Sequence, residues 1–515
     1  MRRPRALLLA LLLLLTGCAA LAEPDVAPEE EWDGYGMIEE EPEEPEPAPE
    51  PAYPAAFSLV YQKDQTLDPV NCGEGIQEDV ASLLYEPLFR LDGQFNPVPV
   101  LCESYAWDET GLVCTLTLRQ DAAFQDGTPL TAADAAASIQ RAAASARYGY
   151  RLRGVASAAA NRAGQVVVTL YAPNQGLPAL LDIPIVKRGT ENLPAPTGTG
   201  PYVLVTGGEG DYLLANEEWW QHKALPVTTI PLVHAKDRDN ALYLFSSHRA
   251  ELLTVDPMDN PSSATGQSQR TDRPTAILQF IGFNTAADRL FASPALRAIF
   301  SQGIPRETLV DAQLAKLALA AQFPISPLSA LYPADLERDC TGEETLEALR
   351  AAGQGTGEVK ALSLLVNQED SFRVTSAQFI AESLSVLDWR ITVRALPWEE
   401  YTAALAAGDF DLYFGEVRLT ADWDLRDLVG TGGALNYGGY TNASTDLMLA
   451  GFAAAADRQA AARQLMAHLQ AAAPIAPICF KNYAVLTHAG VVEGLSPSPS
   501  TTFYGMEEWT VHLSQ

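Results

Sequence analysis

The segment from residue 360 to residue 414 alternates between strand and helix patterns, which restricts the folds open to it. Three short runs are rich in branched and aromatic residues, and two longer runs between them space their apolar residues as helices do. Strands separated by helices are typical of βαβ units, whose strands lie parallel in one sheet. The segment therefore predicts an α/β fold. The expected strands are Lys360–Asn367, Arg390–Leu396 and Phe410–Phe414, and the expected helices are Ser371–Leu387 and Trp398–Ala407.

Elsewhere the chain mixes hairpins and helices. Thr131, followed three residues later by Asp134, is typical of a residue that caps the start of a helix. Two alternating runs face each other across Asp108–Gly111, which has the composition of a hairpin turn. We therefore expect strands at Phe57–Tyr61, Ser104–Trp107, Val113–Arg119 and Val166–Tyr171, a helix from Thr131 to about Ala146, and one long helical stretch at Asp446–Ala473.

A basic and then apolar segment begins the chain. Arginines at positions 2, 3 and 5 precede an almost pure Leu/Ala run from Ala6 to Leu15, as in a secretory signal peptide. About ten apolar residues are too few to span a bilayer, which takes about 20. The ending Leu15-Thr-Gly-Cys18 resembles the bacterial lipobox, so residues 1–17 are a predicted signal peptide and Cys18 a predicted lipidation site. A plain signal peptide, cut a few residues later, is the alternative.

The next segment predicts a spacer. Residues 19–55 contain no Lys or Arg, many Glu and a Pro-Glu alternation, a composition that disfavours ordered structure. We expect residues 18–55 to form a disordered acidic tether that lifts the body from a membrane, and the alternative is an acidic interaction tail. The protein is then expected outside the cytoplasm, held by lipid at the outer face of the cytoplasmic membrane of a bacterial cell.

The body, residues 56–515, is too long for one hydrophobic core. It has about 460 residues, and single cores stop growing near about 250–300, so we expect at least two lobes. The formal net charge is −31, and no Lys/Arg cluster is evident outside the N-terminal segment. Because nucleic-acid binding needs a basic face, that class of function is excluded.

Cysteine and histidine positions indicate no metal site and no cofactor. Besides Cys18 there are five cysteines without CxxC spacing, and the six histidines are scattered along the chain. One structural disulfide is compatible with an oxidising location, without indicating its partners. The five cysteines are Cys72, Cys102, Cys114, Cys340 and Cys479.

An ordered set of short motifs extends over the whole body. Taken in order and with their spacing, they resemble the extracellular solute-binding proteins of family 5, the oligopeptide-, dipeptide- and nickel-type receptors of ABC importers. The motifs are Tyr85–Phe89, Leu116–Arg119, Phe124–Ala132, Pro196–Tyr202, Leu214–Asn216, Gly282–Asn284, Leu296–Arg297, Ile304–Arg306 and Asp409–Asp411. Most of them are interpreted as turns and packing, with Asp126–Gly127 and Gly198–Gly200 needing backbone shapes that glycine tolerates.

The resemblance implies a two-lobed fold of the type II periplasmic-binding-protein kind, with a hinge and a ligand cleft between the lobes. Lobe I would comprise residues 56–273 and the returning segment 478–515. It would contain an inserted subdomain at about 90–190. Lobe II would be residues 274–477. Ligand pockets favour such domain interfaces, and hinge closure is the expected motion.

The resemblance also implies a site in the loop after the Phe410–Phe414 strand. Peptide-binding members place an aspartate there that pairs with the peptide's α-ammonium, and Asp422 best matches it, although the family's Gly-Trp is missing. Arg418 is a candidate for a ligand carboxylate, or for a scaffold pair with Glu416 or Asp422, and Glu416 is itself a candidate ligand contact. Trp423 and Tyr437 are candidates for an aromatic wall, and Asn71 for an approach from lobe I; packing or an ordinary turn is the alternative for each.

Three classes of function compete. The first is a transport receptor that captures a short peptide or similar solute and delivers it, as a monomer, to a membrane permease with a separate ATPase. The second is a ligand-sensing lipoprotein without transport. The third, a secreted enzyme, is disfavoured because the chain lacks Gly-x-Ser-x-Gly and His-Glu-x-x-His motifs. A nickel complex or a sugar remains an alternative ligand.

Overall fold

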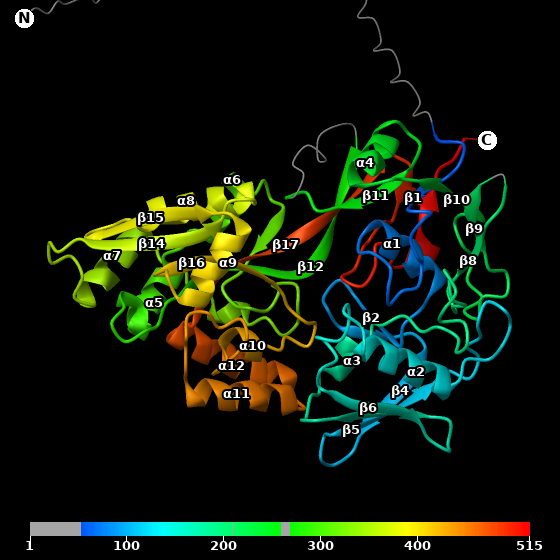
Figure 1. Cartoon of the computed structure of the whole chain (residues 1–515), viewed down its shortest axis with the longest axis horizontal. Helices are drawn as coiled ribbons and strands as arrows, with labels where there is room; N and C mark the ends of the chain where they lie inside the picture. The colour runs from blue at the N-terminus through cyan, green and yellow to red at the C-terminus, as the bar shows by residue number, and fades with distance from the viewer. Residues whose placement is uncertain (1–52, 209, 259–267, 515) are drawn as a thin grey trace, which may run out of the picture. The chain divides into compact units, whose positions relative to one another are not determined.

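The computed structural model describes residues 53–208, 210–258 and 268–514, and its main feature is an eleven-stranded sheet (Figure 1). The strand order is β15-β14-β16-β12-β17-β11-β1-β10-β9-β8, and β13 pairs with β17 beside this path. Cys18 and the predicted signal and tether segments up to residue 52 lie outside the described residues. The last three predicted tether residues, 53–55, pack instead against the end of the chain, where the Pro54 carbonyl accepts a hydrogen bond from the Ser514 amide. The strands are β1 Leu59–Tyr61, β8 Tyr202–Val205, β9 Asp211–Ala215, β10 Thr229–His234, β11 Leu252–Val255, β12 Ser268–Phe283, β13 Ala318–Ala320, β14 Lys360–Asn367, β15 Trp389–Leu396, β16 Leu412–Arg418 and β17 Ile475–His488.

Two long antiparallel strands, β12 and β17, connect the two halves of this sheet (Figure 1). The last part of β17 pairs with β11, whereas the last part of β12 pairs with β16. Their register shifts between Pro274 and Leu278, where proline cannot donate to the strand ladder. The strand pair is thus interrupted between the two halves of the sheet.

The half that contains β14, β15 and β16 confirms the expected α/β character. β14 pairs in parallel with both β15 and β16, as the alternation of strands and helices predicts. Trp389, fully buried, packs against Phe291 and Phe300 in the core of this half. The helices here are α5 Pro294–Gln302, α6 Arg306–Ala312, α7 Gly342–Ala351, α8 Ser371–Leu384 and α9 Trp398–Ala407, with short 3-10 turns at Leu290–Ala292 and Ala334–Leu336.

Three predicted elements in this half are wrong in extent. The helix predicted at Ser371–Leu387 ends at Leu384. The predicted strand Phe410–Phe414 starts later and continues to Arg418, because β16 pairs with β12 along this stretch and Gly415 lies against the ring of Phe280. The predicted single stretch at 446–473 is two helices, since the Asp457 side chain accepts a hydrogen bond from the Ala460 amide and starts a new helix. They are α11 Ala443–Ala454 and α12 Arg458–Ala472, preceded by the short α10 Arg426–Val429.

A separate four-stranded antiparallel sheet has the order β4-β5-β7-β6 and packs against α2. The predicted hairpin is confirmed, and Thr131 caps α2 together with Asp134, as expected; the helix ends three residues before the expected Ala146. The elements are β4 Cys102–Trp107, β5 Val113–Leu118, α2 Ala132–Ala143, β6 Val155–Ala160, β7 Val166–Leu170 and α3 Leu177–Leu180, next to a small β2 Phe89–Leu91 and β3 Pro97–Pro99 pair.

The remaining elements complete the half around β1. Gly198 and Gly200 are needed for close packing rather than for an unusual backbone shape, because a Cβ on Gly198 would lie 2.1 Å from the Leu84 carbonyl oxygen. The five cysteines of the described residues are all free, so no disulfide joins them. Within the described residues, the helices are all too short or too polar to cross a bilayer. The elements are α1 Ile76–Leu84, α4 Arg238–Ser246, β18 Val492–Glu493, a 3-10 turn at Met506–Glu508 and β19 Thr510–Val511.

Candidate ligand-binding cleft

A cavity of about 530 Å³ opens where β12 changes register, and both halves of the large sheet contribute to its wall. Pockets for small ligands in proteins are typically about 300–1,000 Å³ and favour such junctions. One side comes from the start of α1, the segment after α2 and the end of β11, and the other from the end of β16 and the residues that follow it. Polar side chains on the wall include Glu74, Glu78, Arg147, Tyr148, Arg151, Asp182, Thr254, Asp256, Thr275, Arg418, Tyr483 and Ser500.

Glu78 and Arg147 form a close ion pair on the wall. Arg147 Nη2 lies 2.7 Å from Glu78 Oε1, and the arginine also donates to the Cys72 carbonyl oxygen. Burial raises the pKa of Glu78, but the charges of Arg147 and Arg273 outweigh it and hold the pKa below its ordinary value. The carboxylate therefore stays ionised in the cleft at neutral pH.

Arg418 is held more loosely at the opposite side. Its Nη2 donates to the Tyr483 hydroxyl at 2.8 Å and lies 3.7 Å from Glu74 Oε2. Half of the Arg418 side chain and two thirds of the Glu74 side chain are exposed, so this ion pair contributes little stability. Both groups are free to exchange a neighbour for a ligand at small cost.

Arg151 is a second arginine on the same side of the cavity as Arg147. Arg151 pairs with Asp182, whose other carboxylate oxygen accepts a hydrogen bond from Ser500 at 2.9 Å. The Tyr148 ring lies beside both Arg147 and Arg151, with 5.3 and 5.2 Å from guanidinium carbon to ring centroid. The wall thus offers anchored groups of both signs.

Asp422, the residue predicted to bind an ammonium, points into the protein. Its carboxylate accepts hydrogen bonds from Asn174 Nδ2 at 2.7 Å and from Thr420 Oγ1 at 2.5 Å, and only 5% of the residue is exposed. Thr420 and Ala421 line the cavity, whereas Asp422 and Trp423 line a separate small pocket. The ligand-binding role of Asp422 stays a prediction.

The other predicted residues are dispersed. Glu416 accepts a hydrogen bond from Gln279 at 2.9 Å and lies 3.6 Å from Lys481 Nζ, and it shares β16 with Arg418. Tyr437 lies edge-on to Tyr413, outside the cavity wall. The Asn71 side-chain amide donates a hydrogen bond to the Asp68 carboxylate, and the next residue, Cys72, lines the cavity. Of the six predicted ligand contacts, Arg418 is the one that the structure places on the wall.

The loop after β16 contacts the part of the chain around the four-stranded sheet. Arg153 Nη2 lies 3.0 Å from Asp424 Oδ2, and the same guanidinium pairs with Asp427. The Tyr150 hydroxyl also donates to Asp427 at 2.8 Å. Together with the bond between Asn174 and Asp422, these contacts attach the loop to the part of the chain around the four-stranded sheet.

Sequence reasoning missed Glu78, Arg147 and Arg151. A signal was present, because three arginines and two tyrosines occur within residues 147–153, which corrects the expectation of no basic cluster beyond the N-terminal segment. The acidic partners of the two arginines are Glu78, at the start of α1, and Asp182, in the segment after α3. Only the fold therefore brings these charges together.

Comparison with known proteins places the chain in a family. The family described as bacterial extracellular solute-binding proteins, family 5 Middle, matches residues 96–428, which is more than half of the chain. The chain is 24% identical over 367 residues to the glutathione-binding protein GsiB of Salmonella typhimurium, covering 66% of this chain and 71% of that protein.

Solved structures show the same fold. HbpA2 from Haemophilus parasuis has a TM-score of 0.74 at 19% identity, covering 89% of this chain and 100% of that chain. The periplasmic murein tripeptide-binding protein MppA, in its unliganded open form, has a TM-score of 0.73 at 19% identity, covering 87% and 98%. The type II periplasmic-binding-protein fold is therefore confirmed.

The chain belongs to the bacterial extracellular solute-binding proteins of family 5. It is a substrate-binding protein of an ABC importer, and its relatives are solute receptors rather than enzymes.

Proposed function

We propose that the protein captures a short peptide in the cleft and delivers it to a membrane permease. The observation that carries this proposal is the wall of the cavity, where anchored carboxylates and guanidinium groups lie within one space of about 530 Å³. A short peptide is a zwitterion, so a wall with both signs of charge complements its two ends.

Arg418 and Glu74 are the groups best suited to exchange partners. Their 3.7 Å contact is exposed, and an ion pair of this kind contributes about 0–1 kcal/mol. A peptide carboxylate would take the planar guanidinium of Arg418, and its ammonium would take Glu74 or Glu78. The tighter pair of Glu78 and Arg147 would keep its geometry and orient the ligand.

The names of similar proteins agree with a peptide ligand. Glutathione and a murein tripeptide are the solutes named for GsiB and MppA. A nickel complex has less support, since the described residues that line the cavity include no histidine. A sensing lipoprotein without transport is the alternative that a cleft alone does not distinguish.

The N-terminal segment supplies the proposed anchor. Lipidation of Cys18, with residues 18–52 as the tether, would keep the receptor beside its permease at the outer face of the cytoplasmic membrane. Residues 56–273 with 478–515 would form one lobe and residues 274–477 the other. Closure would then bend β12 and β17 near the register shift after Pro274.

Arg418→Ala is expected to weaken the binding of a short peptide by about tenfold or more, because one charge-assisted hydrogen bond of about 1.5–3 kcal/mol is lost. The ligand is first found by native mass spectrometry of gently purified protein and by thermal shift with a panel of di- to pentapeptides. Affinity is then measured by isothermal titration calorimetry for both proteins.

The matched control is Arg463→Ala. The Arg463 side chain is 50% exposed and pairs with Asp335 away from the cavity, against 51% exposure for Arg418. We expect its peptide affinity to equal that of the wild type. A non-peptide solute in the mass spectrum would reject the peptide proposal, and equal affinity of the two variants would reject the role of Arg418.

A further inference from the structure

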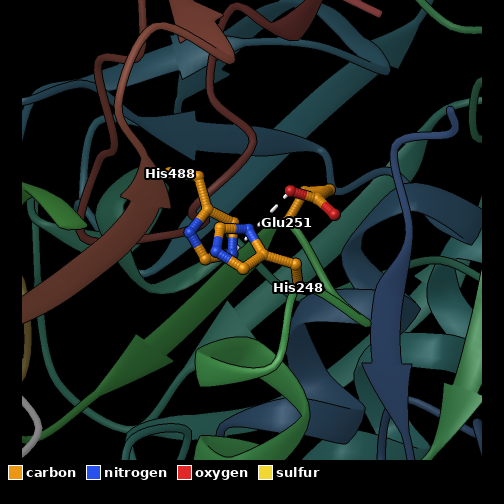
Figure 2. Close-up of side chains that lie close together, drawn as sticks. All are labelled: His248, Glu251 and His488. Carbon is orange, nitrogen blue, oxygen red and sulfur yellow. Dashed lines mark ion pairs between the residues drawn. The ribbon is translucent and has the colours of Figure 1, made fainter. Parts of the chain in front are cut away.

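Two histidines and a glutamate come together where β17 ends and β11 begins, apart from the residues of the cavity wall (Figure 2). His248 follows α4, Glu251 directly precedes β11, and His488 is the last residue of β17. One nitrogen of each imidazole and one carboxylate oxygen all lie within 4.8 Å of one another. Within the described residues, this is the one cluster of three such side chains with the spacing of a metal site.

The cluster holds buried polar atoms that no protein group satisfies. Glu251 Oε2 and His488 Nε2 are inaccessible to solvent and make no hydrogen bond, and their separation of 3.8 Å is too long for one. The Glu251 side chain is 3% exposed. Burying a carboxylate oxygen without a hydrogen bond is costly, and a bound cation would remove that cost.

Aromatic packing explains only part of this arrangement. The His488 ring stacks on Phe245 with ring centroids 4.4 Å apart and planes 7° apart, and on His248 at 3.9 Å and 26°. Stacking accounts for the position of the imidazole rings. It provides no hydrogen bond to the buried carboxylate oxygen of Glu251, which lies beside His488 Nε2 (Figure 2).

We propose that His248, Glu251 and His488 bind one divalent transition-metal ion, with zinc the best match. Two imidazoles and one carboxylate form a donor set that zinc accepts, with water in the fourth position. A tetrahedral zinc site holds its ligand atoms about 3.3 Å apart, so atoms that lie within 4.8 Å of one another approach by at most about 1.5 Å on binding. His248 is exposed and follows the end of a helix, so rotation of its side chain supplies most of that movement and brings its nitrogen out of the stack.

The ion would fasten the connection between α4 and β11 to the end of β17. Both α4 and β11 continue to the cavity wall, through Ala241 and through Leu253 to Val255. The site would therefore stiffen one wall of the ligand cleft without contacting the ligand. Its role is independent of the identity of the peptide.

The test is zinc titration of the mature chain without a polyhistidine tag, by calorimetry and by thermal unfolding with and without ZnCl₂. We expect one equivalent of zinc to bind and to raise the melting temperature. His248→Asn is expected to weaken zinc binding at least tenfold and to abolish the thermal shift, and asparagine tolerates the positive φ of 54° at this position.

His222→Asn is the matched control. His222 is also exposed and has a positive φ of 52°, but it lies outside the cluster, so this variant should bind zinc as the wild type does. Glu251→Gln, which keeps the shape of the side chain, should weaken zinc binding like His248→Asn. Absence of stoichiometric zinc binding to the wild type, or equal affinities for His248→Asn and His222→Asn, would overturn the proposal.

Discussion

Replacing Trp423 by alanine is expected to lower the free energy of unfolding by about 3–5 kcal/mol, the usual cost of removing a large aromatic side chain from a core. Trp423 is 1% exposed and packs between Phe95 and Phe480, with ring centroids 5.1 and 5.9 Å away. These rings come from three distant parts of the chain, so the indole joins the loop after β16 to both. Urea unfolding followed by circular dichroism measures the loss.

The same variant distinguishes packing from ligand contact. The sequence predicts Trp423 as part of an aromatic wall, whereas the structure places it beneath the cavity wall. We expect peptide affinity at low temperature to remain within a few-fold of the wild type. Trp398→Ala is the control, because Trp398 is 51% exposed and its loss should change stability by about 0.5 kcal/mol or less. Near-native stability of Trp423→Ala together with lost peptide binding would show that Trp423 contacts ligand.

Elements with strong local signals were predictable from the sequence. β14 and α9 have the expected bounds. Gly408 caps the end of α9, and its positive φ of 66° suits glycine. The division between α11 and α12 was missed, although Asp457 directly before Arg458 is a readable cap signal. Alanine-rich composition favoured one helix over that local signal.

The cleft was less predictable, because its charges depend on contacts between distant segments. Arg418 was found through the family resemblance, but Glu78 and Arg147 meet only when α1 packs beside the segment after α2. The extension of β16 was also missed, since pairing with β12 overrides the glycine at position 415. Pairing with a distant strand decides where such a strand ends, and local propensity carries no information about that pairing.

Arg147→Met is expected to destabilise the protein at pH 7 by about 2–3 kcal/mol. Breaking a fully buried ion pair costs about 3–5 kcal/mol, and the cost is lower here because Glu78 is one third exposed. The substitution keeps an apolar side chain of similar length beside Tyr148. It removes the positive charge that compensates for the burial of the Glu78 carboxylate. We also expect peptide affinity to fall at least tenfold, since the carboxylate of Glu78 loses the group that orients it. Urea unfolding and calorimetry measure the two effects.

The pH dependence gives this prediction a definite sign. In the wild type the pKa of Glu78 is lowered, because the charges of Arg147 and Arg273 outweigh burial, so the pair's contribution to stability is fully present above the ordinary glutamate pKa of about 4.3 and is lost as the pH falls through the folded value. The stability difference between wild type and Arg147→Met should therefore be largest near pH 7 and shrink below about pH 4. Arg373→Met is the matched control, since Arg373 Nε lies 2.7 Å from Asp370 in a similarly buried pair outside the cavity wall. It should lose stability and keep peptide affinity. A difference between wild type and Arg147→Met that does not change with pH would show that Arg147 does not control the charge of Glu78.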